Sequence, residues 1–186
     1  MRTLSDEQRS TLLSVARQSI QHGLENGQAL KVRLEDFDPE LQDMRAAFVT
    51  LNKNNQLRGC IGHLQAVQPL VTDVAENAYA AGFRDPRFPK LAHDELVLLD
   101  LHISVLSPAE PMVFTSEEHL LEQIRPGIDG LILRDGRYQG TFLPSVWESL
   151  PTVDMFWEQL KRKAGLPTTH WSESLTVARY TTESFS

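Results

Sequence analysis

The residues with the clearest chemical potential lie in one short segment, which contains the chain's single cysteine, Cys60. Arg58, Cys60 and Gly62 alternate with Gly59 and Ile61, so on a regular strand their side chains would share one face. A guanidinium beside a thiol stabilises the thiolate, which is the form that acts as a nucleophile. The flanking glycines would let a ligand or another backbone approach closely. The segment therefore predicts a reactive thiol at Cys60 that is assisted by Arg58.

A cysteine that only packs in the core is the alternative interpretation, because free cysteine is among the most buried residue types. Gly59 and Gly62 would then accommodate a bulge or a tight contact between a helix and the sheet. The two interpretations differ in whether the thiol can be reached from solvent.

A nucleophilic cysteine commonly needs a base nearby, and two histidines are candidates. His63 stands three positions after Cys60, so a regular strand would direct it to the opposite face, and only a bulge, for example at Gly62, would bring it round. His102 lies on the polar face of another alternating segment and would approach Cys60 if the two strands are neighbours. We include both histidines as candidate binding residues.

A second cluster combines charged and aromatic residues in the loop 83–89. Asp85, Arg87 and Phe88 would suit a loop that recognises an anion or a partner protein, since arginine binds carboxylate and phosphate groups in a defined geometry. The alternative is an Asp-Pro turn that an Asp–Arg bridge pins, with Phe83 and Phe88 anchoring it in the core.

Composition narrows the classes of function. The formal net charge of −7 disfavours binding to nucleic acid. One cysteine excludes an intrachain disulfide, and no Cys-x-x-Cys, paired histidine or phosphate-binding glycine motif predicts a metal or a nucleotide cofactor. The first residues lack the apolar stretch of a signal peptide, and no run of about 18 apolar residues occurs, so we expect a soluble, cytoplasmic protein.

The elements that position these residues follow from periodicity and turn signals. Ser5 and Gln8 form a capping box that predicts a helix over residues 6–25. The other expected elements are strands at 46–51 and 57–62 around a turn, a helix from Pro69 to Gly82, a strand at 97–106, a helix at 116–124, strands at 130–134 and 137–142 around Asp135-Gly136, a helix at 153–164 and a strand at 174–180. This order predicts an α+β fold, with a mainly antiparallel sheet flanked by helices.

Several segments together resemble one known family. They are Leu57-Arg58-Gly59-Cys60-Ile61-Gly62, Phe83-x-Asp85-Pro86-Arg87-Phe88, Ile103-Ser104-Val105-Leu106-Ser107-Pro108, Arg125-Pro126-Gly127-Ile128-Asp129-Gly130-Leu131-Ile132-Leu133 and Thr141-Phe142-Leu143-Pro144-x-Val146-Trp147. The chain resembles the AMMECR domain family, whose prokaryotic members are called AmmeMemoRadiSam system protein A. The resemblance runs from about Leu12 to Phe185.

The resemblance implies a single AMMECR-like domain over 1–186, with a larger part built on a mostly antiparallel sheet and a smaller subdomain packed beside it. It also implies that residues 58–62 are the hallmark positions and that residues 85–88 come second. His63 and His102 depart from the residue types of many relatives, which weakens a Cys–His mechanism. The family has no settled activity, and the resemblance implies a pathway shared with a Memo-like protein and a radical S-adenosylmethionine protein.

Two hypotheses follow. In the first, the protein is an enzyme or an enzyme component that uses Cys60 as nucleophile or covalent carrier, with Arg58 activating the thiol and helping to bind an anionic substrate that Asp85 and Arg87 orient. In the second, the same surface is a non-catalytic adaptor that docks the partner proteins. The oligomeric state stays open at this stage.

Overall fold

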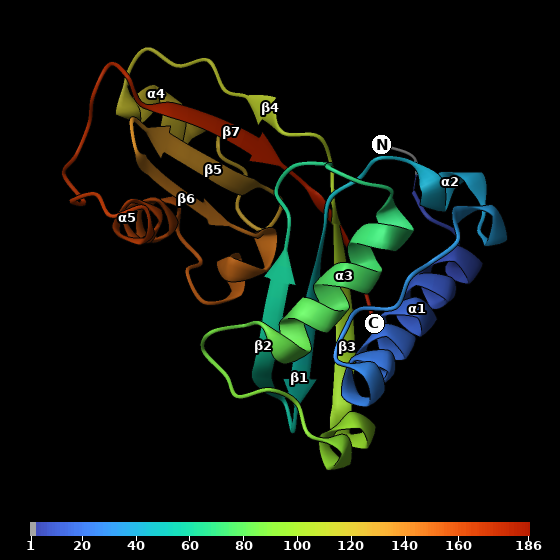
Figure 1. Cartoon of the computed structure of the whole chain (residues 1–186). Coiled ribbons are helices and arrows are strands. Elements are labelled where there is room, and N and C mark those ends of the chain that lie inside the picture. Colours follow the sequence, from blue (N-terminus) through green and yellow to red (C-terminus); the bar gives the residue numbers. More distant parts are fainter. Residues whose placement is uncertain (1–2) are drawn as a thin grey trace. The chain divides into compact units, whose positions relative to one another are not determined.

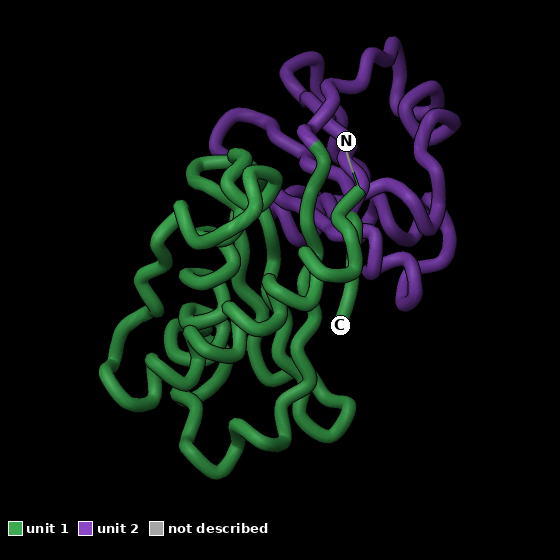
Figure 2. The backbone as a smooth tube through the Cα atoms, turned by 90° about the vertical axis from the view of Figure 1, so that its right-hand side faces the viewer, with its two compact units in different colours: residues 1–107, 183–186 green, residues 108–182 purple. Residues whose placement is uncertain are grey.

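The computed structural model describes residues 3–186, which divide into two compact units (Figures 1 and 2). Unit 1 contains the described residues up to Ser107 together with Glu183–Ser186, and unit 2 contains Pro108–Thr182. Both carry a four-stranded sheet, so the predicted α+β class is confirmed, with two sheets in place of the single one that we expected. No helix within residues 3–186 is long and apolar enough to cross a membrane.

Unit 1 begins with helix α1, Asp6–Asn26, whose start and end agree with the sequence prediction. The Ser5 side chain accepts a hydrogen bond from the backbone N–H of Gln8, and the Gln8 side chain accepts one from the backbone N–H of Ser5. This reciprocal pair satisfies two N–H groups that a helix start otherwise leaves without partners. Gly27 ends the helix with φ of 69°, a left-handed conformation that suits glycine.

The sheet of unit 1 has the strand order β2-β1-β3-β8. Its strands are β1 Ala47–Lys53, β2 Gln56–Gly62, β3 Leu99–Leu106 and β8 Thr182–Phe185. β1 pairs antiparallel with both β2 and β3, so β2 is an edge strand. The β1–β2 hairpin turns through Asn54 and Asn55, whose φ angles of 53° and 60° are those of a two-residue turn with the twist that hairpins favour.

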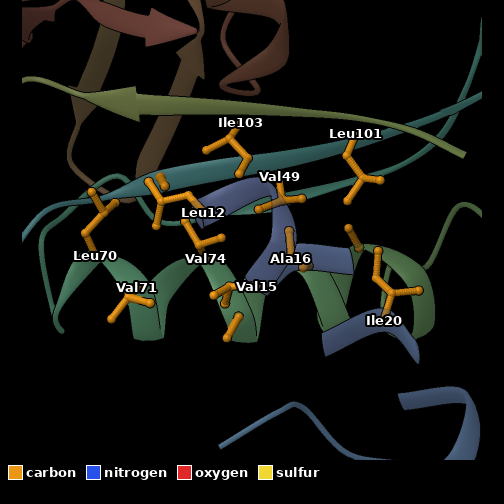
Figure 3. Packing of buried hydrophobic residues seen from close by; sticks show 14 of the residues in the cluster. Leu12, Val15, Ala16, Ile20, Val49, Leu70, Val71, Val74, Leu101 and Ile103 are labelled. Carbon is orange, nitrogen blue, oxygen red and sulfur yellow. The ribbon is translucent and has the colours of Figure 1, made fainter. Parts of the chain in front are cut away.

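The core of unit 1 lies between one face of this sheet and the helices α1 and α3, Leu70–Phe83 (Figures 1 and 3). Val49 and Ile103 of the sheet are fully buried with Leu12 of α1 and Val74 of α3. Burying a side chain of this size contributes roughly 1.5–3 kcal/mol. Because a slip of one residue would turn every core side chain to the other face, this packing fixes the register of the strands.

Unit 2 carries the second sheet, in the order β4-β7-β5-β6. Its elements are β4 Glu110–Pro111, α4 Glu117–Gln123, β5 Gly130–Asp135, β6 Tyr138–Phe142, α5 Val153–Lys163 and β7 Thr176–Tyr180. The hairpin predicted at Asp135-Gly136 is present, but its two turn residues are Gly136 and Arg137, because Asp135 pairs with Tyr138; φ is 55° at the glycine. Its core contains Trp147 stacked on Phe156, with the ring centres 3.9 Å apart.

The elements that sequence patterns missed are short. They are the 3₁₀ helices η1 Leu34–Asp36, η2 His93–Leu98 and η3 Pro144–Glu148, the helix α2 Pro39–Gln42, and the strands β4 and β8. The strand predicted over 97–106 begins at Leu99 because η2 occupies the residues before it. Elements of so few residues carry too little periodicity for a pattern to reveal them.

Candidate functional site

Cys60 lies on the edge strand β2, opposite Thr50 of β1. Its backbone groups are directed away from β1: the N–H donates to Asp85 Oδ2 at 3.0 Å, and the carbonyl oxygen accepts from Arg87 Nη2 at 3.4 Å. Thr50 and Cys60 therefore form a pair without mutual backbone hydrogen bonds, in which side chains lie closest. The Thr50 hydroxyl donates to Cys60 Sγ across this pair at 3.2 Å.

Thr50 is a site residue that sequence reasoning missed. A threonine in a predicted strand is ordinary, since β-branched residues favour strands. Its relation to the thiol depends on the register of β1 against β2, which no local pattern contains. The available signal was one polar side chain at position 50 between the apolar Val49 and Leu51.

Asp85 and Arg87 form a clamp on the backbone of Cys60. The buried Asp85 carboxylate accepts from Arg87 three times, from the backbone N–H at 3.1 Å, from Nε at 3.0 Å and from Nη2 at 2.7 Å. The hydrogen bond from the Arg87 side chain is the main reason why the pKa of Asp85 lies well below its usual range, and the Cys60 N–H adds to this. The Asp–Arg bridge expected in this loop is thus present, with Arg87 as its arginine, and it holds the residue that carries the thiol.

The pKa of Arg87 is raised, first by its hydrogen bond to Asp85. Its side chain is 54% exposed, so this cation also faces solvent, next to the Cys60 carbonyl oxygen that its Nη2 binds at 3.4 Å.

Arg58 does not take the place that the sequence predicted for it. The pairing of β1 with β2 shifts between Leu51 and Asn52, so Gly59 lies opposite Leu51 and Leu57 lies opposite Asn52. Arg58 is the extra residue of this bulge, and the alternation of side chains restarts there. Leu57, with Gly62, shares the face of Cys60, and the expectation that Arg58 shares it was wrong.

The Arg58 guanidinium instead binds Glu95 of η2, with 2.9 Å from Nε to Oε1 and 2.9 Å from Nη2 to Oε2. Lys53 Nζ also donates to Oε1, at 2.9 Å. These partners, Arg58 first, lower the pKa of Glu95 to about 2. The Arg58 side chain is only 10% exposed, and its Nη1 is buried with no hydrogen-bond partner among the described residues.

Phe88 connects the two arginines. Its ring centre lies 5.9 Å from Arg58 Cζ and 5.5 Å from Arg87 Cζ, within the range of cation–π attraction. The predicted hallmark segment and the predicted loop 83–89 are therefore brought together, with Phe88 between their cations.

Steric contacts explain why Gly59 and Gly62 carry no side chain. A Cβ on Gly59 would lie 2.1 Å from the carbonyl oxygen of Ala81 in α3, and one on Gly62 would lie 2.5 Å from the carbonyl oxygen of Ala47. Tight packing of helix and strand, which was one of the two alternatives, accounts for Gly59, and close contact of β2 with β1 accounts for Gly62. Close approach of a ligand is not needed to explain either.

His63 lies on the face opposite Cys60, as a regular strand requires. The only register shift between β1 and β2 in the described pairing comes before Gly59, so no bulge at Gly62 turns the histidine round. Its Nδ1 lies 2.5 Å from Oδ1 of the buried Asp73, a carboxylate that also accepts from the Ala47 N–H and from Asn77. This network holds the end of β2 on α3.

His102 does not reach the thiol either. It pairs with Thr50 from the other side, so β1 separates β3 from β2 and the two strands are not neighbours. Two strand spacings put Cys60 and His102 about 10 Å apart. His102 instead lines a cavity of about 460 Å³ in unit 1, together with Arg17, Asn52 and Asp100.

Within residues 3–186, no cluster of three or more histidine, cysteine, aspartate or glutamate side chains is arranged to hold a metal ion. The residues that the structure does assemble are one thiol, one hydroxyl that donates to it, and one exposed guanidinium anchored on a buried carboxylate. Such a set can stabilise a thiolate and position it beside a bound molecule.

The fold and this thiol centre define an α+β protein of two antiparallel sheets with a single cysteine on an edge strand. The AMMECR1 family matches residues 13–185, and the chain belongs to that family. It is 37% identical over 169 residues to a protein of Methanothermobacter thermautotrophicus, covering 88% of this chain and 85% of the relative. A protein of Thermococcus gammatolerans is 37% identical over 196 residues, covering 100% and 93%.

A solved structure, that of the uncharacterized protein PH0010 from Pyrococcus horikoshii, has the same fold. It superimposes with a TM-score of 0.90 at 34% identity, covering 97% of this chain and 92% of that one. The resemblance seen in the sequence motifs is thereby confirmed.

Proposed function

We propose that the protein is an enzyme, or an enzyme component, in which Cys60 Sγ is the nucleophile or the covalent carrier. The observation that carries the proposal is the hydrogen bond from the Thr50 hydroxyl to the sulfur. A donor aimed at a thiol stabilises the thiolate relative to the neutral form. A cysteine that only packs in a core needs no such donor.

Arg87 takes the role that the sequence had given to Arg58. Its guanidinium bonds the carbonyl oxygen of Cys60 and is held by Asp85, so its positive charge is kept at the backbone of the residue that carries the thiol. Arg58 is committed to Glu95 and acts as a structural support of the bulge in β2. No base is required within bonding distance if the thiolate is stabilised in this way.

We place the reaction in the cytoplasm, where a single reactive thiol stays reduced. The partners proposed for it are a Memo-like protein and a radical S-adenosylmethionine protein, which would supply or consume the molecule that Cys60 carries. Membership of the family is what supports this part of the proposal.

Replacing Thr50 tests the proposal. Thr50→Val keeps the shape of the side chain and removes the hydroxyl, and we expect the native protein to react with iodoacetamide about fivefold more slowly, as the loss of one hydrogen bond of about 1 kcal/mol requires. Thr176→Val removes an exposed strand threonine of unit 2 and is the matched control. Cys60→Ser should take up no label. Equal rates for Thr50→Val and the wild type would remove the basis of the proposal.

A docking function is the second candidate, and exposed apolar side chains favour it. Leu57, next to Arg58, is 44% exposed, and Val97 and Leu98 of η2, the helix of Glu95, are 83% and 48% exposed. If the surface is an adaptor, Leu57→Ser and Val97→Ser should weaken binding to a Memo-like partner while Cys60→Ser binds normally. If Cys60→Ser keeps binding but loses the pathway's activity, the catalytic proposal is the correct one.

A further inference from the structure

The hydrogen bonds of Arg87 leave one edge of its guanidinium available. Nε and Nη2 are directed to Asp85, and Nη2 also reaches the carbonyl oxygen of Cys60. Among the described residues no hydrogen bond involves Nη1. The side chain is 54% exposed, so the Nη1 edge of a guanidinium that Asp85 holds in place faces solvent.

One ion-pair network next to Phe88 has more cations than carboxylates, although the chain as a whole carries a net charge of −7. Lys53 and Arg58 share the single carboxylate of Glu95, which leaves one cation in excess. Arg58 Nη1 is buried without a hydrogen-bond partner among the described residues, in a side chain that is only 10% exposed. Buried donors of native proteins are nearly always satisfied by protein, water or a ligand, so this N–H can still serve one acceptor.

Phe88 contacts both arginines through its ring. Its ring lies within 6.0 Å of both guanidinium carbons, at 5.9 Å for Arg58 and 5.5 Å for Arg87. Cys60 adjoins this group through its carbonyl oxygen, which Arg87 binds. A molecule held by the outer edge of Arg87 therefore lies beside the residue that carries the thiol.

We infer that the substrate of the Cys60 thiol carries an anionic oxygen group, a carboxylate or a phosphate, close to its reactive carbon, and that Arg87 binds this group. The inference rests on the proposed function, because it names the class of molecule that the thiol meets. Arginine matches both oxyanions through paired N–H donors, and Asp85 sets the orientation of the guanidinium before the ligand arrives.

Two alkylating agents of nearly equal size test it. Iodoacetate carries a carboxylate and iodoacetamide a neutral amide; in each case the thiolate sulfur attacks the methylene carbon, the carbon–sulfur bond forms and iodide leaves. We expect the native protein to prefer iodoacetate by about tenfold relative to the preference of the urea-unfolded chain, which has a bare thiol. Every label reports on Cys60, the chain's single cysteine.

Variants assign the preference to Arg87. Arg87→Gln should reduce the ratio of the two rates to that of the unfolded chain. Arg84→Gln is the matched control, because Arg84 is an exposed cation of the same loop that lies over Tyr79 and its loss changes the net charge equally. Arg87→Lys keeps the positive charge but lacks the paired N–H donors of the guanidinium, so it should retain only part of the preference for iodoacetate. Inorganic phosphate and acetate, added as competitors of iodoacetate, show which oxyanion the site favours.

The outcomes separate the inference from the proposed function. If the native protein reacts with iodoacetamide but shows no preference for iodoacetate, the inferred anion site is overturned. The proposal of a reactive thiol would still stand. An equal loss of preference in Arg87→Gln and Arg84→Gln would show general charge attraction and would also overturn it. A native protein that reacts with neither reagent until it is unfolded would refute the proposed function itself.

Discussion

Replacement of Asp85 is the perturbation whose size the structure defines best. The carboxylate accepts one hydrogen bond from the Cys60 N–H and three from Arg87. Asp85→Asn keeps an oxygen for the Cys60 N–H but presents an uncharged amide to Arg87. Because Arg87 is half exposed, water replaces part of what it loses, and we expect a loss of about 2 kcal/mol in the free energy of unfolding.

Asp85→Ala also leaves the Cys60 N–H without its acceptor. This adds the cost of an unsatisfied donor, so the total loss should be about 4 kcal/mol. The loss in Asp85→Asn therefore measures the part of the clamp that holds Arg87. The additional loss in Asp85→Ala measures the part that holds the backbone of Cys60.

The pH dependence has a definite sign. Because the pKa of Asp85 is lowered in the folded protein, its contribution is fully present above the unfolded pKa of about 3.9 and is lost as the pH falls through the folded value. At about pH 3 the advantage of the wild type over Asp85→Asn should therefore shrink by about 1 kcal/mol. Other carboxylates titrate equally in both proteins and cancel in the difference.

Urea unfolding followed by far-UV circular dichroism measures these quantities, since α1 and α3 supply most of the helical residues that unit 1 contributes. Two results would refute the reasoning: equal losses for Asp85→Asn and Asp85→Ala, or a difference from the wild type that is the same at neutral pH and at about pH 3.

The remaining predictions concern packing and acid stability. Gly59→Ala should lower the free energy of unfolding by about 3 kcal/mol or more, because its methyl group would meet the Ala81 carbonyl oxygen at 2.1 Å; a loss below about 1 kcal/mol in urea unfolding would contradict this. Asp135, whose pKa is lowered to about 2 by Ser172, Ser174 and His170, should stabilise unit 2 above about pH 4 and lose this effect as the pH falls toward 2. Asp135→Asn should then flatten the acid-induced change in tryptophan fluorescence, which reports on unit 2 because all 3 tryptophans lie there; an unchanged acid transition would speak against it.

Much of the framework could be predicted because the signals are local. The capping box at Ser5 and Gln8, the Asp135-Gly136 turn and the alternation of Leu101 and Ile103 each act over a few residues, and the structure confirms the elements that they predict. The family motifs extended this to the α+β class.

The arrangement of the candidate site could not be predicted, because it depends on the register of one strand against another. A single extra residue in β2 moves Arg58 away from the thiol, and nothing in the sequence around Arg58 marks the bulge. The same register brings Thr50 to the sulfur and puts β1 between Cys60 and His102. Such pairings follow from packing of the whole sheet on its helices, which local patterns do not contain.

The rate at which native Cys60 reacts with iodoacetamide at about pH 6 tests the central claim most directly, since an ordinary thiol is less than about 1% ionised there. We predict that the native protein reacts at least about tenfold faster than the same chain unfolded in urea. A native rate equal to or below that of the unfolded chain would show that Thr50 and Arg87 do not activate the thiol, and would contradict the account.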